Sequence, residues 1–331
     1  MPGGVVSIKE IAERAGTSVA TVSRVINQNG RFSKETEERV RRVIEEFDYH
    51  PNNVARALRQ DRMRVIGVVL PDITSAYFAG IARSIEETLL DRGYMAVLCD
   101  TGEKEQIEAQ YINMLTAMRA TGIIYISERQ TTTRLDVPVV YVDRRPGNGS
   151  MSPGSCFIGS DNRRGGYLAA ERLIAAGRRS LAVVMHRKEL DTQRDRYEGF
   201  CRAMRENGVG GGQPQIWAAD EVDYQNGFSV TEKILAAPQI PDGIFYSSDV
   251  LAIGGVHCLD YHGIPVPGRI SVIGMDNIPL GEQIRPKLTT VNQQYERFGR
   301  LAASSILDII ENGTVAENKI LDVTIVERES V

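Results

Sequence analysis

The sequence lacks a long hydrophobic run. No uninterrupted apolar stretch approaches the roughly 20 residues that a membrane-spanning helix requires, and the N-terminus lacks a signal-peptide pattern. These absences argue against a membrane partner and against export, so we expect a cytoplasmic protein. The chain is 42% hydrophobic and 25% charged, as in ordinary soluble proteins, and its 331 residues suit a small domain joined to a larger one.

Cysteine, histidine and known catalytic motifs are also scarce. The four cysteines lie far apart without a CxxC pair, and the four histidines lack metal-ligand spacing. We therefore expect buried free thiols, no metal site and no cofactor. GxxxxGK[ST], HExxH and GxSxG are absent, and no predicted strand is followed by GxGxxG. Without a nucleophile-and-base constellation, we expect that the protein is not an enzyme.

A large surplus of one charge is missing as well, since the net charge is only −4. Residues 1–62 nevertheless hold eleven Lys and Arg against nine Asp and Glu, a net of +2, which leaves −6 for the remainder. This modest asymmetry permits a nucleic-acid-binding N-terminal segment without proving one.

The N-terminal segment predicts three short helices. Ser7 and Glu10 have the spacing of a capping box, Gly16 ends the first helix, and Ser18 and Ser33 cap the second and third. Apolar residues recur at helical spacing in each helix. Two helices joined by a short glycine-containing turn form a helix-turn-helix.

The outward face of the second helix carries short or hydrogen-bonding side chains, which let a helix enter the major groove of DNA. Arginine can pair with guanine there, and small apolar groups can touch thymine methyl groups. A helical bundle without a DNA role is the alternative, but the residue types favour double-stranded DNA as a partner. The predicted DNA-binding residues of this helix are Ser18, Val19, Ala20, Thr21, Ser23, Arg24 and Asn27.

From Arg64 onward, short apolar runs alternate with helical patterns, which predicts two βα series, mainly parallel sheets, and two lobes with a cleft between them. The expected strands are 65–70, 94–100, 122–127, 137–143, 180–186, 215–218, 243–249 and 270–276. The expected helices are 78–92, 106–119, 162–176, 196–207, 225–236 and 250–262. The glycine-rich segment 208–213 is expected to be a surface turn.

Polar residues recur where predicted strands end. They are Asp72, Asp143 with Arg144, Asp161, Asp249 and Asp276. Any one of these aspartates could be a helix cap, but ligands of parallel sheets bind at this edge, and the recurrence favours a binding site. Carboxylates that accept pairs of hydroxyls, with arginine as a donor, suit a polyhydroxylated ligand such as a sugar.

These segments together closely resemble the lactose/galactose repressor family of bacterial transcription regulators, nearly end to end. The segments that carry the resemblance are SIKEIAERAGTSVATVSRVIN (7–27), SKETEERVRRVIEEFDYHPNNVARALR (33–59), SDNRRGGYLAAERLIAAG (160–177), SSDVLAIGG (247–255), ISVIGMDN (270–277) and LTTVNQ (288–293). The resemblance implies a helix-turn-helix domain at 1–50, a hinge helix and linker at 51–62, and a periplasmic-binding-protein-like effector and dimerisation domain at 63–331. Its N-lobe would comprise 63–160 and 293–321, and its C-lobe 161–292 and 322–331, with three crossings between them.

The resemblance also implies a ligand-responsive repressor of carbohydrate-use genes, bound to a near-palindromic operator on the nucleoid as a homodimer. Because the sequence stops soon after its last predicted strand, without a leucine-heptad tail, we expect a dimer and not a tetramer. Leu58 of the hinge helix would be a minor-groove wedge, with Asn53 and Ala55 beside it on the DNA. The implied effector-binding residues are Asp72, Tyr77, Phe78, Asp143, Arg144, Asp161, Arg196, Asp249, Asp276 and Gln293.

Two departures from the family pattern bear on the effector. Leu190 stands where purine-responsive members carry an arginine, and Val222 stands where sugar-binding members often place a stacking aromatic. A sugar or sugar derivative remains the expected ligand, with a nucleoside-type effector or control by a phosphoprotein partner as alternatives. Whether the ligand is an inducer or a corepressor stays open.

Overall fold

The computed structural model describes residues 7–26, 28–47, 49, 64–126, 135–146, 151–187, 190–314 and 317–331. The chain divides into two compact units, Met1–Met63 and Arg64–Val331. The predicted DNA contacts Asn27, Asn53, Ala55 and Leu58 lie outside the described residues.

The first unit contains helices α1 (Ile8–Arg14), α2 (Val19–Ile26) and α3 (Lys34–Glu46). The predicted capping box is confirmed, because the Glu10 amide donates to the Ser7 hydroxyl and the Ser7 amide donates to the Glu10 carboxylate at 2.7 Å. Ser18 and Ser33 cap α2 and α3 through the amides of the residues three positions later, both at 3.2 Å. The inner faces of the helices form a core whose fully buried members include Ile11, Val22 and Val40.

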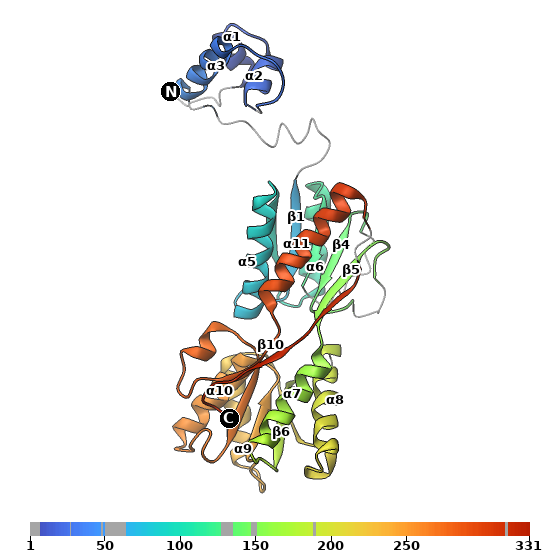
Figure 1. The fold of residues 1–331 in the computed structure, drawn as a ribbon, viewed down its shortest axis with the longest axis vertical. Coiled ribbons are helices and arrows are strands. Elements are labelled where there is room, and N and C mark those ends of the chain that lie inside the picture. The colour runs from blue at the N-terminus through green and yellow to red at the C-terminus, as the bar shows by residue number, and fades with distance from the viewer. Residues whose placement is uncertain are drawn as a thin grey trace. The chain divides into compact units, whose positions relative to one another are not determined.

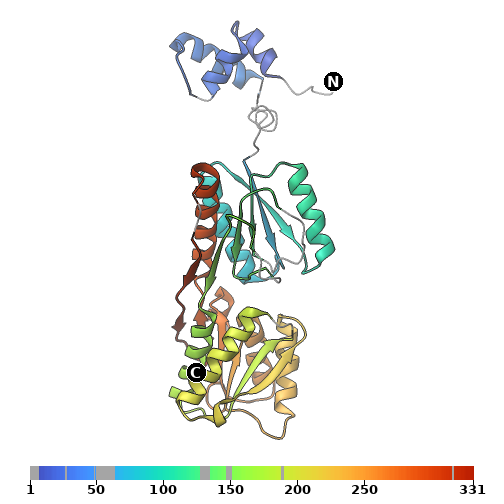
Figure 2. The same cartoon turned by 90° about the vertical axis from the view of Figure 1, so that its right-hand side faces the viewer.

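The second unit begins with a sheet that supports one lobe. Its strands, in spatial order, are β11 (Lys319–Leu321), β5 (Cys156–Ser160), β4 (Val139–Val142), β3 (Gly122–Tyr125), β1 (Val65–Leu70) and β2 (Met95–Asp100). All pairings are parallel. Helices α5 (Ala76–Asp91) and α11 (Tyr295–Asn312) pack together on one face, and α6 (Glu105–Ala117) covers the other (Figure 2).

A second sheet supports the other lobe. Its spatial order is β12 (Thr324–Val326), β10 (Thr289–Asn292), β9 (Ser271–Asp276), β8 (Gly243–Tyr246), β6 (Leu181–His186) and β7 (Gln215–Ala219), and only β12 runs antiparallel to its neighbour. Alternate residues of β6 point to opposite faces, as the pleat requires. Leu181 and Val183 face the core under α7 (Asn162–Ala175) and α8 (Asp191–Glu206), whereas Ala182 and Val184 face the core under α9 (Tyr224–Leu235) and α10 (Asp249–Tyr261).

The chain passes between the two sheets three times: after β5, after β10, and between β11 and β12 (Figure 1). This two-lobed α/β architecture with mainly parallel sheets confirms the fold class predicted from the sequence. The carboxyl ends of both sets of strands consequently face the region where the lobes meet.

Several details differ from the sequence-based expectations, which also do not include helix α11 or strands β10 and β11. Strand β5 is not predicted, because CFIGS contains a glycine and a serine and too few β-branched residues to stand out. Helix α8 begins at Asp191, five residues before the predicted start, because the polar TQRD turn has no apolar periodicity to mark it. The 208–213 segment contains a short 3₁₀ helix at Gly210–Gly212.

Helices α7 and α8 cross at two glycines. A Cβ on Gly166 would lie 1.8 Å from the carbonyl oxygen of Arg196, and a Cβ on Gly199 would lie 1.8 Å from that of Arg163. No larger side chain fits at either position without moving a helix. Residues 166 and 199 therefore set how closely the start of α8, which carries Arg196, approaches α7.

The four cysteines are free and buried, as predicted. Among the described residues, no cluster of His, Cys, Asp and Glu could hold a metal ion. Nor does any helix in the described part of the chain combine the length and apolar character needed to cross a bilayer.

Candidate functional site

A cavity of about 510 Å³ lies where the carboxyl ends of the two sheets meet, which is within the usual size of a small-molecule site. Segments from both lobes form its wall: residues after β1, β2 and β4 on one side, and residues after β6, β7, β8 and β9 on the other. Seven of the ten predicted effector residues line it. They are Asp72, Tyr77, Phe78, Asp143, Arg144, Arg196 and Asp276.

The wall from the first lobe centres on Asp143. The Tyr77 hydroxyl donates to the Asp143 carboxylate at 2.8 Å, and burial together with the negative charge of Asp143 raises the pKa of Tyr77 well above its usual value. Arg144 donates to Glu103 at 2.6 Å and lies over the ring of Phe78, 5.3 Å from its centre. The arginine of this wall is thus already paired with a carboxylate and stacked on an aromatic ring.

The wall from the second lobe centres on Arg196, whose side chain is almost fully buried. Its Nε donates to the Asn162 side chain at 2.7 Å, one terminal nitrogen donates to the Ser247 carbonyl at 2.6 Å, and the other donates to Gln293 at 3.2 Å. Such a buried guanidinium needs these acceptors, because an unpaired buried charge is strongly unfavourable. The hydrogen bonds fix Arg196 in the wall.

Asp276 completes this network. Its carboxylate accepts from the Ser248 hydroxyl at 2.9 Å and from the Gln293 amide at 2.6 Å. Burial, together with the negative charge of nearby Asp249, raises the pKa of Asp276 to about 7, although Arg196 and the hydrogen bonds from Ser248 and Gln293 act in the opposite direction. This carboxyl group therefore gains and loses its proton near neutral pH.

Three predicted effector residues do not reach the cavity wall. Asp161 instead caps α7, accepting from the Arg164 amide at 2.8 Å, which is the alternative that the sequence left open. Asp249 is fully buried behind the wall and accepts from the Thr290 hydroxyl at 2.6 Å and from the Ile278 amide at 2.9 Å. The pattern of strand-end aspartates does not separate these from Asp143 and Asp276, because it gives position along the chain but not the direction of the side chain.

Gln293 also lies behind the wall, where the chain crosses from the second sheet back to the first. Its amide oxygen accepts from Arg196 and, at 2.7 Å, from the hydroxyl of Ser160, the last residue of β5. Its amide nitrogen donates to Asp276. One side chain thus connects the wall of the second lobe to a strand of the first.

Sequence reasoning misses several polar residues of the wall. The most informative are Gln193, which is 7% exposed, and Ser247, which is fully buried. Among the described atoms, neither the Gln193 Oε1 nor the Ser247 Oγ has a hydrogen-bond partner, and both residues line the cavity. The polar TQRD sequence just before the predicted start of the helix could have indicated Gln193 as a wall residue, but the same sequence is equally typical of an exposed first helical turn. The other missed members include Glu103, His186, Thr192, Glu221, Asp223 and Ser248.

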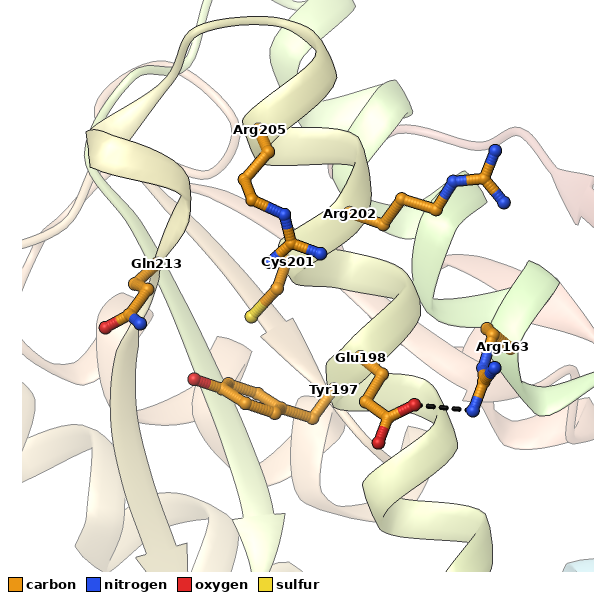
Figure 3. Close-up of a pocket in the computed structure, with 7 residues that line it drawn as sticks. All are labelled: Arg163, Tyr197, Glu198, Cys201, Arg202, Arg205 and Gln213. Atoms are coloured by element: carbon orange, nitrogen blue, oxygen red, sulfur yellow. Dashed lines mark hydrogen bonds and ion pairs between the residues drawn. The ribbon is translucent and has the colours of Figure 1, made fainter.

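A second pocket lies on the outer surface of α8, where Arg163, Tyr197, Glu198, Arg205 and Gln213 come together (Figure 3). Arg163 pairs with Glu198, and Arg163, Glu198, Arg205 and Gln213 are exposed, whereas Cys201, which is drawn beside them, is buried. Among the described atoms of this pocket, none is a buried polar group without a partner. It lacks the feature that distinguishes the cavity between the lobes.

In the first unit, α2 presents the predicted face. Ser18, Ala20 and Arg24 are exposed, and Val19, Thr21 and Ser23 are half-buried. The stem of Arg24 lies against Gly30, whose φ of +98° allows the following turn to approach it. No ion pair to Arg24 occurs among the described side chains, so its guanidinium is available to a partner.

Two family models match the chain. Residues 7–52 match the bacterial regulatory proteins of the lacI family, and residues 170–331 match a periplasmic binding protein-like domain. A ribose operon repressor from Halalkalibacterium halodurans is 33% identical and shares 92% of this chain and 90% of its own length. The transcriptional repressor PurR of Pasteurella multocida is 32% identical, with 92% of both proteins covered.

Solved structures of similar fold include lacI-family regulators. A lac repressor dimer bound to operator and the anti-inducer ONPF has a TM-score of 0.87 at 24% identity, with 99% of both chains covered, which is a likeness of fold alone. A lacI-family regulator from Enterococcus faecium with bound ribose has a TM-score of 0.73 at 28% identity, covering 81% of this chain and 98% of that one.

Proposed function

We propose that a sugar or sugar derivative controls this chain by binding in the cavity between its two lobes. The chain belongs to the lacI family of bacterial regulatory proteins. The chain is a ligand-responsive transcriptional repressor. The proposal adds the effector class, the residues that bind it, and a cytoplasmic homodimer acting on carbohydrate-use genes.

The buried network around Arg196, Gln293 and Asp276 carries the proposal. It places the Arg196 guanidinium and the Asp276 carboxylate in the same cavity wall, both hydrogen-bonded to Gln293. Sugar hydroxyls can accept hydrogen bonds from the guanidinium and donate to the carboxylate. The similarity to a ribose operon repressor and to a lacI-family structure with bound ribose supports this ligand class. Because Gln293 also bonds to Ser160 of the other lobe, a ligand on this wall can favour one lobe arrangement over another.

A purine effector is the second candidate, since PurR proteins are among the relatives. The cavity argues against it. Leu190 lies in the wall where purine-responsive members carry an arginine, and Val222 is a further apolar residue of the same wall. Of the two aromatic residues in the described wall, Tyr77 is buried against Phe78, and Phe78 has Arg144 over its ring. Little aromatic surface is left for a purine to stack on.

For the DNA, we propose that the exposed residues of α2 read a twofold-symmetric operator, with Arg24 as the principal base-reading side chain. Short neighbours such as Ala20 allow close approach to the groove, and the unpaired Arg24 can donate two hydrogen bonds to a guanine. Two such units in a dimer would contact two half-sites.

A thermal-shift and calorimetry screen of pentoses, hexoses, polyols, nucleosides and purine bases tests the effector class. A ligand at 100 times its Kd adds about 2.7 kcal/mol of stability, which such a screen detects readily. Each hit is then tested for a change in operator affinity. The proposal fails if only purines or nucleosides bind, or if a bound sugar leaves operator affinity unchanged.

A further inference from the structure

We propose that the cavity selects effectors without negative charge, and that Gln193 recognises a hydrogen-bond donor on the bound molecule. This inference rests on the proposed function and narrows it to neutral or amino sugars and polyols. Sugar phosphates, sugar acids and nucleotides are excluded as effectors.

The charge of the described wall is the first argument. Six carboxylates line the cavity, at Asp72, Glu103, Asp143, Glu221, Asp223 and Asp276, against only two guanidinium groups, at Arg144 and Arg196. Even with a proton on Asp276, acidic groups remain in excess. A ligand anion placed among them would meet like charges at close range, which strongly disfavours binding.

The state of the two arginines is the second argument. Arg144 is paired with Glu103 at 2.6 Å, so its charge is already neutralised. Arg196 uses three of its five N–H groups on Asn162, Ser247 and Gln293. Two N–H groups remain, one on each terminal nitrogen, and a neutral hydroxyl can accept from either of them without displacing the hydrogen bonds to Asn162, Ser247 and Gln293.

The position of Gln193 supports the second part of the inference, that the bound molecule carries a hydrogen-bond donor. Its side chain is 7% exposed in the first turn of α8 and lines the cavity, and no described atom donates a hydrogen bond to its Oε1. An amide oxygen only accepts hydrogen bonds, so the missing partner must be a donor. Hydroxyl and ammonium groups are donors, whereas ionised phosphate and carboxylate oxygens are not. Ser247, whose Oγ is also buried and unpartnered, can bond to the same kind of ligand.

The test compares each neutral probe with its charged counterpart by calorimetry on the full-length protein. Suitable sets are D-ribose with ribose 5-phosphate, and D-glucose with glucosamine, gluconate and glucose 6-phosphate. We expect every anion to bind at least about 100-fold more weakly than its neutral parent, and glucosamine to bind no more weakly than glucose. An anion that binds as tightly as its parent overturns the inference and leaves the sugar proposal intact. If no member of either set binds but a purine does, the proposed function and this inference both fail.

A pair of variants tests Gln193. Gln193→Met keeps the length of the side chain but removes the acceptor, and we expect it to bind the neutral probe about tenfold more weakly. Its melting temperature without ligand should equal or exceed that of the wild type, because the change removes a buried oxygen that has no partner in the free protein. Gln213→Met, on an exposed glutamine of the surface pocket, is the matched control and should bind like the wild type. Wild-type affinity in Gln193→Met would overturn the assignment.

Glu221→Gln tests the charge argument. The wild type should bind the neutral probe more tightly than its phosphate. Removing one carboxylate from the wall should reduce this preference by about threefold or more. A preference unchanged from the wild type would show that wall charge does not set the selectivity and would overturn that part of the inference.

Discussion

Asp143 and Asp276 occupy equivalent places in the two sheets. Asp143 follows β4 and Asp276 ends β9, and both have a positive φ, +64° and +125°. Residues other than glycine adopt this conformation only where surrounding contacts hold them, and such residues concentrate at functional sites. Tyr77 holds Asp143, and Ser248 and Gln293 hold Asp276. Each lobe therefore presents one fixed carboxylate to the same cavity.

The raised pKa of Asp276 predicts a pH dependence of stability. Its pKa is about 7 in the folded protein against an ordinary value of 3.8, so the folded state binds the proton more tightly than the unfolded state. The contribution is fully present below about pH 4 and is lost as the pH rises through 7. We expect this contribution to the free energy of unfolding to fall between about pH 4 and 7, and Asp276→Asn to flatten that fall by on the order of 1–3 kcal/mol.

Denaturant unfolding of ligand-free protein at several pH values measures this. Asp195→Asn, at a solvent-exposed carboxylate, serves as the control and should keep the wild-type slope. If Asp276→Asn keeps the wild-type slope as well, Asp276 does not take up the proton.

Arg196 should be required for the ligand response. Arg196→Ala removes three buried hydrogen bonds and the donor that the cavity offers, so ligand should no longer change operator affinity. With an inducer, the variant stays on the operator in the presence of ligand; with a corepressor, it binds weakly throughout. Operator titrations with and without ligand decide the matter, and Arg202→Ala, at an exposed arginine of the same helix, should respond normally. A normal shift in Arg196→Ala would place the effector elsewhere.

Gln293 should transmit the response between the lobes. Gln293→Met cuts the hydrogen bonds to Ser160 and Asp276 and keeps the size of the side chain. We expect the ligand-induced change in operator affinity to shrink by about fivefold or more, a loss of about 1 kcal/mol of coupling. Ligand affinity is measured in parallel. If the variant loses ligand affinity by the same factor as it loses the change in operator affinity, Gln293 only helps to bind the ligand and does not couple the lobes.

The sequence predicts most of the fold because buried parallel strands are short apolar runs, and caps such as Ser7 and Ser33 mark helix starts. Because strand ends meet at one edge of a sheet, the strand pattern predicts four of the residues that line the cavity, Asp72, Asp143, Arg144 and Asp276. The other three, Tyr77, Phe78 and Arg196, come from the family resemblance alone. The strand pattern does not distinguish Asp249, which points behind the wall, from Asp276. Gln193 and Ser247 are missed because an unpartnered polar atom is a property of the packed structure. The contact of Gly166 with α8 is equally invisible, since it depends on how two helices cross.

That crossing predicts a sensitive glycine. Gly166→Ala would bring its Cβ to 1.8 Å from the Arg196 carbonyl oxygen, so α8 must move and Arg196 with it. We expect a destabilisation of about 2–4 kcal/mol together with weaker ligand binding, measured by thermal unfolding and calorimetry. Gly281→Ala, where the nearest atom is 3.5 Å away, should be close to neutral. A Gly166→Ala protein with wild-type stability would mean that the helices can separate freely.

On the DNA side, Arg24→Ala should relax base preference at one position of each half-site, with a cost of about 1–3 kcal/mol there. Binding to a library of operator variants, at fixed salt, measures this. Arg41→Ala, at an exposed arginine of α3 paired with Glu37, should leave the preference unchanged. A loss spread evenly over all sequences would instead make Arg24 a phosphate contact.

The placement of β11 and β12 has a consequence for how the protein is made. These two strands belong to different sheets and are separated by only Asp322 and Val323. Helix α11, which covers the first sheet, also follows every strand of the second sheet except β12 along the chain. On the ribosome, the first lobe therefore cannot finish folding while the second is being synthesised, unlike chains whose domains fold one after another. Both lobes acquire their edge strands within a few residues of each other, so a newly made molecule becomes able to sense its ligand only once both lobes have been translated.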